Sequence, residues 1–421
     1  MLTFLCRALR AERHELPALA WSFAYFFTLL AGYYVLRPVR DEMGVQAGTA
    51  QLPWLFTATF VTMLALVPLY GWLCARLPRA RLLPAVYGFF AANLVVFWAA
   101  LESGVPAKAL APAFFVWVSV FNLFVVSVFW ALIVDTFNSE QGKRLFGFIA
   151  AGATIGAITG SSITATFARH VPTPLLLAGA IILLEVGVFS VRHLSRLSEA
   201  LNARPNEALG SPVGGNVLAG ITHPFKSAYL ANVSLFILLF AITATFLYFQ
   251  QAGLVRDNFH DRGAQTAFFA QIDLAVNVIT LIVQLFFTGR IVGILGVSLT
   301  LAILPALTLL GFGALAALPA VSTLVVFQVL RRSSDYAIAR PTREVLYTVV
   351  PREDRYKAKS FIDTVVYRGG DQIGAWAYAL IAMTGFGSTL MAAIAIGLAA
   401  LWLLNGLWLG RRQALLARQE G

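Results

Sequence analysis

The chain has 421 residues, of which 59% are hydrophobic and 12% are charged, and its mean hydropathy is +0.77. Soluble domains average roughly 45–50% apolar and about 25% charged residues. The composition therefore excludes an ordinary soluble protein. It indicates a multi-pass membrane protein whose main surroundings are a lipid bilayer.

Twelve apolar runs of about 20 residues, the length that crosses a bilayer core, predict an all-α membrane protein with twelve transmembrane helices. The runs lie near residues 17–37, 54–74, 82–101, 110–134, 145–168, 174–192, 228–251, 265–288, 291–312, 317–338, 361–383 and 387–409. The arginines of the amino-terminal segment follow its short apolar start instead of preceding it, so the segment is not expected to be a cleaved signal peptide.

The distribution of positive charge predicts the orientation of these helices. Most of the 31 Lys and Arg residues fall before the first run or in the loops on that same side of the membrane. Cytoplasmic loops carry such an excess. We therefore expect the protein in the inner (plasma) membrane with both termini in the cytoplasm. The formal net charge of +11 is then largely a result of topology, and it gives no reason to expect a nucleic-acid partner.

A long polar interval divides the runs into two groups of six. The predicted division is an N-terminal six-helix half over residues 1–195, a central cytoplasmic linker over 196–226 and a C-terminal six-helix half over 227–421. A weak internal repeat supports it, because "PVRDEM" after the first run is similar to "LVRDNF" after the seventh. Two six-helix repeats joined by a long cytoplasmic loop are the architecture of the major facilitator transporters.

The pattern Arg-Pro-x-Arg-acid occurs twice, within "YYVLRPVRDEMG" and within "YAIARPTREVLY". If each helix continues through its proline, a tyrosine and both arginines share one helical face. The residues are Tyr33, Arg37 and Arg40 in the first copy and Tyr336, Arg340 and Arg343 in the second. The spacing between the copies differs from that of the internal repeat, so duplication of the halves does not account for them.

Arginines at the ends of apolar helices have two interpretations. They can be interfacial anchors whose long stems reach the lipid headgroups. Alternatively, their planar guanidinium groups bind phosphate or carboxylate through two parallel hydrogen bonds, and a neighbouring tyrosine offers a hydroxyl group or a flat surface for a base. A proline in a spanning helix is tolerated where it faces protein or a water-filled cavity. The second occurrence of the motif favours binding of a multiply charged anion.

Three segments resemble, in order and spacing, the characteristic segments of the ATP/ADP antiporter family, the nucleotide translocases of plastids and obligate intracellular bacteria. They read "YYVLRPVRDEMGV", "FWALIVDTFNSEQGKRLFGFIAAGATIG" and "ARPTREVLYTVVPREDRYKAKSFIDTV". The resemblance implies a major-facilitator-type fold and an exchange of nucleotides. The family carries lysine at the positions of Arg40 and Arg343, and it tends to carry glutamate at the position of Asp135.

Ionisable groups at membrane depth are usually functional or paired inside the helix bundle. Asp135 is expected to position an arginine or to gate the pathway. Asp273 is either a proton-coupling acid or a structural hydrogen-bond partner, and Arg368 is expected to pair with Asp371 at i+3. The five histidines are scattered and the two cysteines lack metal-ligand spacing, so neither a metal nor a cofactor is predicted.

The sequence thus predicts a secondary transporter of an organic phosphate anion, by resemblance an ATP/ADP-type nucleotide exchanger, and not an enzyme. Two alternatives stay open: a proton-coupled major facilitator transporter of another solute, and a transport-inactive membrane subunit or sensor. No pattern identifies a protein partner. Four motif arginines with few acids near them would make the empty carrier strongly cationic, which favours exchange over net uptake.

Overall fold

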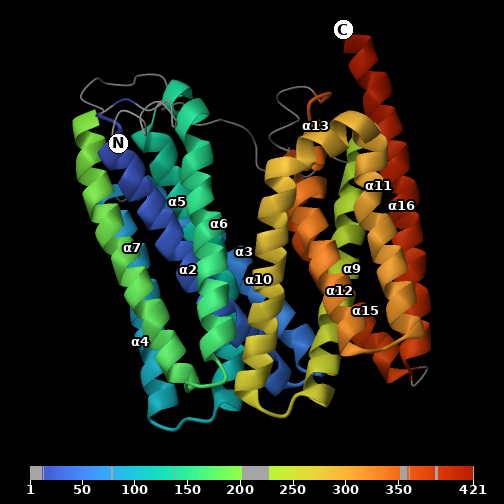
Figure 1. Ribbon diagram of the computed structural model, residues 1–421, viewed down its shortest axis with the longest axis horizontal. Helices are drawn as coiled ribbons and strands as arrows, with labels where there is room; N and C mark the ends of the chain where they lie inside the picture. Colours follow the sequence, from blue (N-terminus) through green and yellow to red (C-terminus); the bar gives the residue numbers. More distant parts are fainter. Residues whose placement is uncertain are drawn as a thin grey trace. The chain divides into compact units, whose positions relative to one another are not determined.

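The computed structural model describes residues 12, 14–76, 79–137, 139–201, 227–350, 358, 359, 361–384 and 387–420 (Figure 1). The regular structure of these residues is helical throughout. The elements are α2 (Leu16–Ala47), α3 (Leu52–Arg76), α4 (Arg79–Glu102), α5 (Ala107–Thr136), α6 (Ser139–Phe167), α7 (Thr173–Leu201), α9 (Ala228–Asn258), α10 (Arg262–Phe286), α11 (Thr288–Ala317), α12 (Val321–Ser334), η1 (Asp335–Ala339), α13 (Arg340–Leu346), η2 (Ile362–Val366), α15 (Tyr367–Met383) and α16 (Gly387–Glu420).

Each of the twelve predicted runs coincides with a helical segment. Nine helices of the described residues are long and apolar enough to cross a membrane, and α3 adds the shorter apolar stretch Leu52–Leu66. The tenth and eleventh runs fall on the segments α12–η1–α13 and η2–α15, which contain π-helical turns. The prediction of an all-α membrane protein with twelve membrane helices is therefore confirmed.

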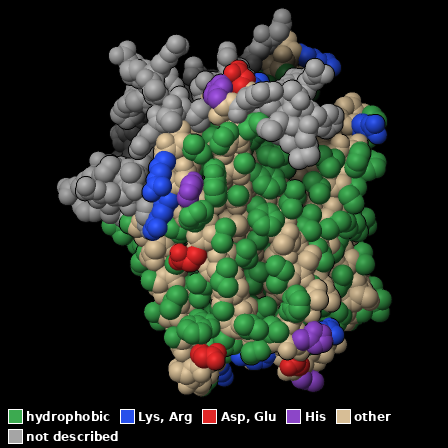
Figure 2. All heavy atoms as spheres, turned by 60° about the vertical axis from the view of Figure 1, so that its left-hand side comes forward, with side chains coloured by type: hydrophobic (Ala, Val, Ile, Leu, Met, Phe, Trp, Pro, Cys, Tyr) green, Lys and Arg blue, Asp and Glu red, His purple; other side chains and the backbone are tan. Residues whose placement is uncertain are grey.

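The surface has the distribution of side chains that a bilayer requires. Hydrophobic side chains cover most of the face in Figure 2, and charged side chains gather near its upper and lower ends. One acidic side chain and a group of basic ones at the left edge are exceptions. Many large apolar side chains are exposed, among them Phe89 at 61% and Ile182 at 64%. Such contiguous apolar surface is stable in lipid and not in water.

The chain forms two compact units. The first comprises Met1–Ala47, Ala58–Ser211 and Phe259–Leu274, and the second comprises Gly48–Thr57, Pro212–Asn258 and Ala275–Gly421. Helix α10 therefore begins in the first unit and ends in the second.

Helix α2 is at the centre of the first unit, where it packs against α5, α6 and α7. Its aromatic side chains interlock with those of α5: the rings of Phe26 and Phe129 stack with centroids 3.8 Å apart. The hydroxyl groups of Tyr25 and Tyr87 are hydrogen-bonded, and both side chains are fully buried. These contacts fix the rotation of α2 and therefore the direction in which its arginines point.

Close packing of α6 on α2 depends on glycine. A Cβ atom on Gly156 would lie 2.3 Å from the carbonyl oxygen of Phe27, and one on Gly160 would lie 2.2 Å from that of Ala31. Small residues at four-residue spacing let two helix backbones approach in this way. The glycines therefore have a packing role.

The second unit is built around α9, which packs against α15 and α16. Trp402 is fully buried, and its ring contacts those of Phe236 and Phe240 at centroid distances of 5.3 and 5.8 Å.

A buried arginine ties three helices of the second unit together. Arg331 of α12 is 3% exposed and donates hydrogen bonds of 3.2 Å to the carbonyl oxygen of Phe240, to Thr243 Oγ1 and to Thr308 Oγ1. A buried charge is tolerated only when it is hydrogen-bonded in this manner. Arg331 thus anchors α12 immediately before the second arginine motif.

Replacing Gly156 with Ala tests the packing of α6 on α2. Because the obstacle is a backbone carbonyl, the helices must separate, and we expect a cost of about 1–3 kcal/mol and a lower melting temperature in detergent. Gly147→Ala on the same helix is the control, since a Cβ there meets nothing within 4 Å. Equal melting temperatures for the two variants would contradict the close approach.

Candidate functional site

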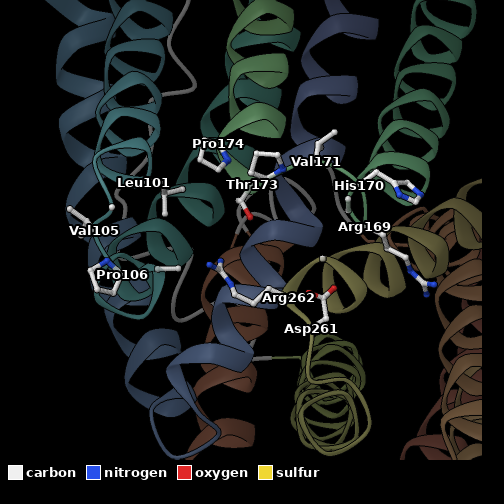
Figure 3. Close-up of a pocket in the computed structure, with 15 residues that line it drawn as sticks. Leu101, Val105, Pro106, Arg169, His170, Val171, Thr173, Pro174, Asp261 and Arg262 are labelled. Carbon is white, nitrogen blue, oxygen red and sulfur yellow. The ribbon is translucent and has the colours of Figure 1, made fainter.

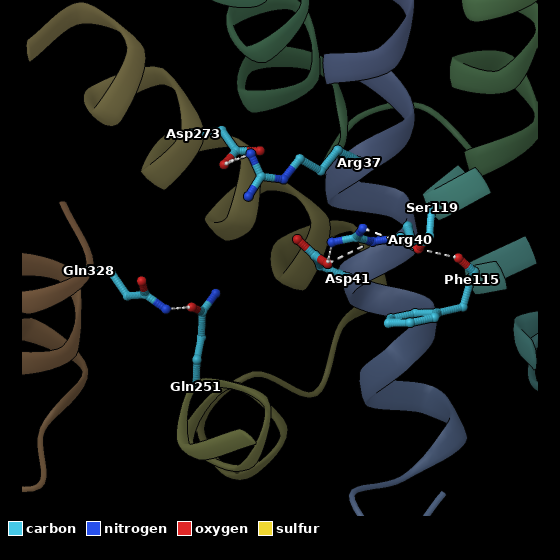
Figure 4. Close-up of polar contacts among 8 residues, drawn as sticks. All are labelled: Arg37, Arg40, Asp41, Phe115, Ser119, Gln251, Asp273 and Gln328. Carbon is cyan, nitrogen blue, oxygen red and sulfur yellow. Dashed lines mark hydrogen bonds and ion pairs between the residues drawn. The ribbon is translucent and has the colours of Figure 1, made fainter. Parts of the chain in front are cut away.

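The first arginine motif lies within an unbroken helix. Helix α2 continues through Pro38, which was the condition for Tyr33, Arg37 and Arg40 to share one face. Arg37 Nη1 lies 3.4 Å from Oδ1 of Asp273, which belongs to α10, and the two side chains point toward each other (Figure 4). The Asp273 side chain is only 2% exposed. Asp273 is therefore paired with Arg37, and both roles expected for it, proton coupling and structural pairing, stay open.

Arg40 is held by its neighbour in sequence and by α5. Its Nε and Nη2 atoms donate hydrogen bonds of 3.1 and 2.6 Å to Asp41 Oδ1, and Nη1 is 3.5 Å from Ser119 Oγ (Figure 4). The guanidinium group also lies over the ring of Phe115, 5.2 Å from its centroid. Because Asp41 and Phe115 flank the group, its orientation is restricted although it is 15% exposed.

Two adjacent tyrosines accompany Arg37 in the first motif. The guanidinium group of Arg37 lies over the ring of Tyr34, 5.7 Å from its centroid. Tyr33 is 8% exposed and packs edge-on against Tyr34. Tyr34 is therefore a contact that the helical-face argument missed, and the adjacent position in "YYVLR" was the available signal.

A π-helical turn shapes the second motif. Helix α12 ends at Ser334, and within η1 the backbone N–H of Arg340 bonds to the carbonyl oxygen of Asp335, five residues earlier. The wider turn brings the two side chains together: Arg340 Nε lies 3.1 Å from Asp335 Oδ2. The guanidinium group also lies over the ring of Tyr336, 4.4 Å from its centroid. The Asp335 side chain is 7% exposed, whereas that of Arg340 is 51% exposed.

Arg343 has a looser carboxylate partner. Its Nη2 atom is 3.9 Å from Oδ1 of Asp363, in the second π-helical turn, η2. The side chains are 16% and 34% exposed, respectively. Arg343 Nε is buried and has no hydrogen-bond partner among the described residues. The guanidinium group is therefore incompletely satisfied by the contacts of the second unit.

Three predicted site residues remain: Arg368 and Asp371, which form a pair, and Asp135. Arg368 Nη1 lies 3.3 Å from Asp371 Oδ2, which is the predicted i+3 pair, and Thr245 donates a hydrogen bond of 3.3 Å to Asp371 Oδ1. Asp135 lies near the end of α5, but its side chain is outside the described residues.

The expectation of few acids near the four motif arginines is wrong. Each of them has a carboxylate within ion-pair distance, and the partners are Asp273, Asp41, Asp335 and Asp363. The sequence contained no periodic signal for Asp335, because five-residue spacing is characteristic of a π turn and not of an α-helix. Asp363 is distant in sequence from Arg343. The charge of the motif arginines is therefore accompanied by negative charge within the protein itself.

Polar contacts also connect α2 with the first turn of α10. Arg262 Nε and Nη2 donate hydrogen bonds of 2.7 and 3.0 Å to the two carboxylate oxygens of Glu42, which is fully buried. Gln46 Nε2 donates one of 3.2 Å to Gln265 Oε1. With the Arg37–Asp273 pair, these contacts fix the register of α10 on α2 within the first unit.

A cavity of about 510 Å³ lies where the α4–α5, α6–α7 and α9–α10 connections of the first unit meet (Figure 3). Its lining includes Arg169, Thr173, Asp261 and Arg262. In Figure 3 the side chains of Arg169 and Arg262 point in opposite directions, and Arg262 is engaged by Glu42. Because its cations do not converge, this cavity is a weaker candidate for an anion site than the arginine motifs.

Glu15, immediately before α2, forms a hydrogen-bonded cluster with α6. Its carboxylate is 1% exposed and accepts hydrogen bonds from the backbone N–H of Glu12 at 2.8 Å, from Gln141 Nε2 at 2.8 Å and from Arg144 Nη2 at 2.9 Å. Burial raises the pKa of Glu15, but these donors outweigh it and hold the pKa below its ordinary value.

Comparisons with known proteins identify the fold. No family model matches the sequence, and no curated protein matches it. Solved structures are similar. A bacterial homologue of the iron transporter ferroportin in an inward-facing state has a TM-score of 0.66 at 13% identity, covering 94% of this chain and 99% of that one. The nucleoside transporter NupG gives 0.63 at 15% identity, covering 94% and 98%.

A third structure extends this likeness over nearly the full chain. A bacterial homologue of the human lysosomal transporter Spinster, inward-facing and unoccupied, has a TM-score of 0.58 at 14% identity, covering 97% of this chain and 98% of that one. The chain is therefore a multi-pass membrane protein with the fold of the major facilitator transporters, as the sequence predicted.

Acidification tests the Glu15 cluster. Because the folded-state pKa of Glu15 is lowered, its contribution to stability is complete above the ordinary pKa of about 4.3 and is lost as the pH falls through the lowered value. At pH 7 we expect Glu15→Gln to lower the melting temperature in detergent, with a cost of about 1–3 kcal/mol. The difference from the wild type should shrink below about pH 4. Glu102→Gln, at an exposed position, is the control; a pH-independent difference would argue against the assignment.

Proposed function

We propose that the chain is a secondary transporter of an organic phosphate anion, and that it exchanges nucleotides of the ATP/ADP type. Arg37, Arg40, Arg340 and Arg343 bind the phosphate groups. The observation that carries the proposal is that each motif arginine, in a chain with this fold, has a carboxylate within ion-pair distance inside the protein. Interfacial anchors need no such partner, because they end in mobile headgroups and water.

The geometry of Arg340 shows how a motif arginine can bind a phosphate group. Asp335 engages its Nε edge, and the head is half exposed, so Nη1 and Nη2 can meet two oxygens of a phosphate group. Tyr336 beneath the guanidinium group supports this orientation. Arginine remains charged in such surroundings, where a lysine loses its proton more readily. The resemblance of both motifs to those of the ATP/ADP antiporters favours a nucleotide as the anion, with both termini in the cytoplasm.

A proton-coupled transporter of another solute is the second candidate, and one observation favours it. Asp273 is a 2% exposed carboxylate that pairs with Arg37 at membrane depth. Protonation of Asp273 would release Arg37, so proton binding and anion binding would be linked through that arginine. With carboxylates beside every motif arginine, charge alone does not decide between exchange and proton coupling. Flux measurements separate the two.

Substitution of the motif arginines tests anion binding. We expect Arg40→Ala or Arg343→Ala to weaken ATP binding by at least about tenfold, since a phosphate group loses a charged donor pair. Lysine at either position should be milder because a point charge remains. Binding is measured as ligand-induced thermal stabilisation of the purified protein. Arg256→Ala, which removes an exposed ion pair with Asp257, is the control. Unchanged binding by Arg40→Ala would support interfacial anchoring instead.

Transport in proteoliposomes tests exchange. Uptake of labelled ATP should be fast with unlabelled ADP inside, slow without it, and little changed when the pH gradient is collapsed. Asp273→Asn should retain exchange if Asp273 only orients Arg37. Rapid accumulation into empty vesicles that follows a proton gradient and is abolished by Asp273→Asn would establish the proton-coupled alternative. Absence of any flux with retained binding would indicate a transport-inactive sensor.

A further inference from the structure

Two π-helical turns supply the carboxylates that contact the second arginine motif. Asp335 is the first residue of η1 and Asp363 the second residue of η2. π-Helical turns are rare and occur frequently at functional sites, because the extra residue redirects side chains at a cost in helix stability. Here the redirected side chains are the partners of Arg340 and Arg343. Because π-helical turns are rare, the presence of one beside each of these arginines favours a role in anion binding.

Asp335 has the properties of a permanent partner. Its side chain is 7% exposed, and it contacts Arg340 through Nε at 3.1 Å, the edge opposite the Nη pair that meets an anion. The guanidinium plane is supported from below by Tyr336. One turn earlier, the buried guanidinium group of Arg331 attracts the same carboxylate. Because this carboxylate is buried, withdrawing it from Arg340 would break a buried ion pair, which is costly.

Asp363 has the opposite properties. It contacts Arg343 through a terminal nitrogen, Nη2, at 3.9 Å, beyond the range of a good hydrogen bond, and its side chain is 34% exposed. Nη2 is a group that a phosphate oxygen would use. Arg343 Nε, meanwhile, is buried without a hydrogen-bond partner among the described residues. Arg343 therefore gains hydrogen bonds when an anion arrives, and Asp363 can turn toward solvent at little cost.

We propose that the two aspartates have different roles: Asp335 is a positioning residue that holds Arg340 in its binding orientation, and Asp363 is a counter-ion that the transported anion displaces from Arg343. This inference rests on the proposed anion transport and specifies its regulation. Asp363 neutralises Arg343 while the carrier is empty, and the anion takes over that neutralisation when the carrier is loaded.

The same charge change at the two positions must then have opposite effects. Asp335→Asn should weaken ATP binding about tenfold, because the guanidinium group loses its orientation. Asp363→Asn should strengthen ATP binding about two- to fivefold, the range of a partly exposed ion pair that no longer has to be broken. Both constants are measured by isothermal titration or ligand-induced thermal stabilisation, with inorganic pyrophosphate as a second probe. Asp257→Asn, in an exposed ion pair of the second unit, should leave the affinities for ATP and for pyrophosphate unchanged.

Double substitution separates these roles from general damage to the fold. In an Arg340→Ala background, Asp335→Asn should have no further effect on binding, and in an Arg343→Ala background, Asp363→Asn should lose its effect. If Asp335→Asn does not fold, Arg340→Lys replaces it. The single amino group of a lysine at position 340 would pair with Asp335, so ATP binding should fall as far as in Arg340→Ala. Arg343→Lys, by contrast, should weaken ATP binding only slightly.

The outcomes distinguish this inference from the proposed function. If the wild type binds neither ATP nor pyrophosphate, the proposed function and the inference both fail. If it binds either probe but the two aspartate substitutions shift affinity in the same direction, or if the shifts persist in the arginine-free backgrounds, anion binding stands and the division of roles is wrong. If the two aspartate substitutions shift the affinity in opposite directions, and both shifts disappear in the Arg340→Ala and Arg343→Ala backgrounds, the division of roles is established.

Discussion

The pairing of arginine with carboxylate at membrane depth is the constraint on which the rest of this structure depends. A guanidinium group cannot lose its proton at physiological pH, so each one placed inside a helix bundle must be surrounded by acceptors. Arg331 meets this requirement with one carbonyl and two hydroxyl groups, and it stays in place. The motif arginines meet it with carboxylates instead, and those carboxylates differ in burial and distance. These differences separate close, buried contacts from loose, partly exposed ones.

The packing of each unit supports its arginines. In the first unit, the approach of α6 at Gly156 and the stacking of Phe26 on Phe129 determine the rotation of α2. Those contacts determine the face of α2 on which Arg37 and Arg40 lie. In the second unit, Arg331 anchors α12 one turn before η1. Rigid elements thus place the arginines, whereas the carboxylates that pair with them range from buried, as for Asp335, to partly exposed, as for Asp363.

Much of the architecture was predictable from the sequence, and the reasons lie in its composition. Apolar runs of bilayer length locate the helices, because lipid exposure demands them. The pair formed by Arg368 and Asp371 follows from ordinary α-helical spacing. The partner Asp335 was not predictable, since a π turn has no periodic signature. Asp363 is brought to Arg343 by tertiary packing alone. The contact of Arg37 with Tyr34 was not predicted, because the helical-face argument considered only Tyr33.

For the proposed transporter, internal counter-ions lower the free-energy cost of moving the empty carrier between its two states. Without them, moving the arginines through a low dielectric would expose uncompensated charge, and exchange would follow from electrostatics alone. With Asp273 and Asp335 buried beside their arginines, most of that charge is compensated in both states. If the proposed function holds, the balance depends on weak pairs such as that of Asp363, with which the anion competes. A carrier of that kind would have only a modest preference for the loaded state, and a change in one loosely held carboxylate would shift it between exchange and net transport.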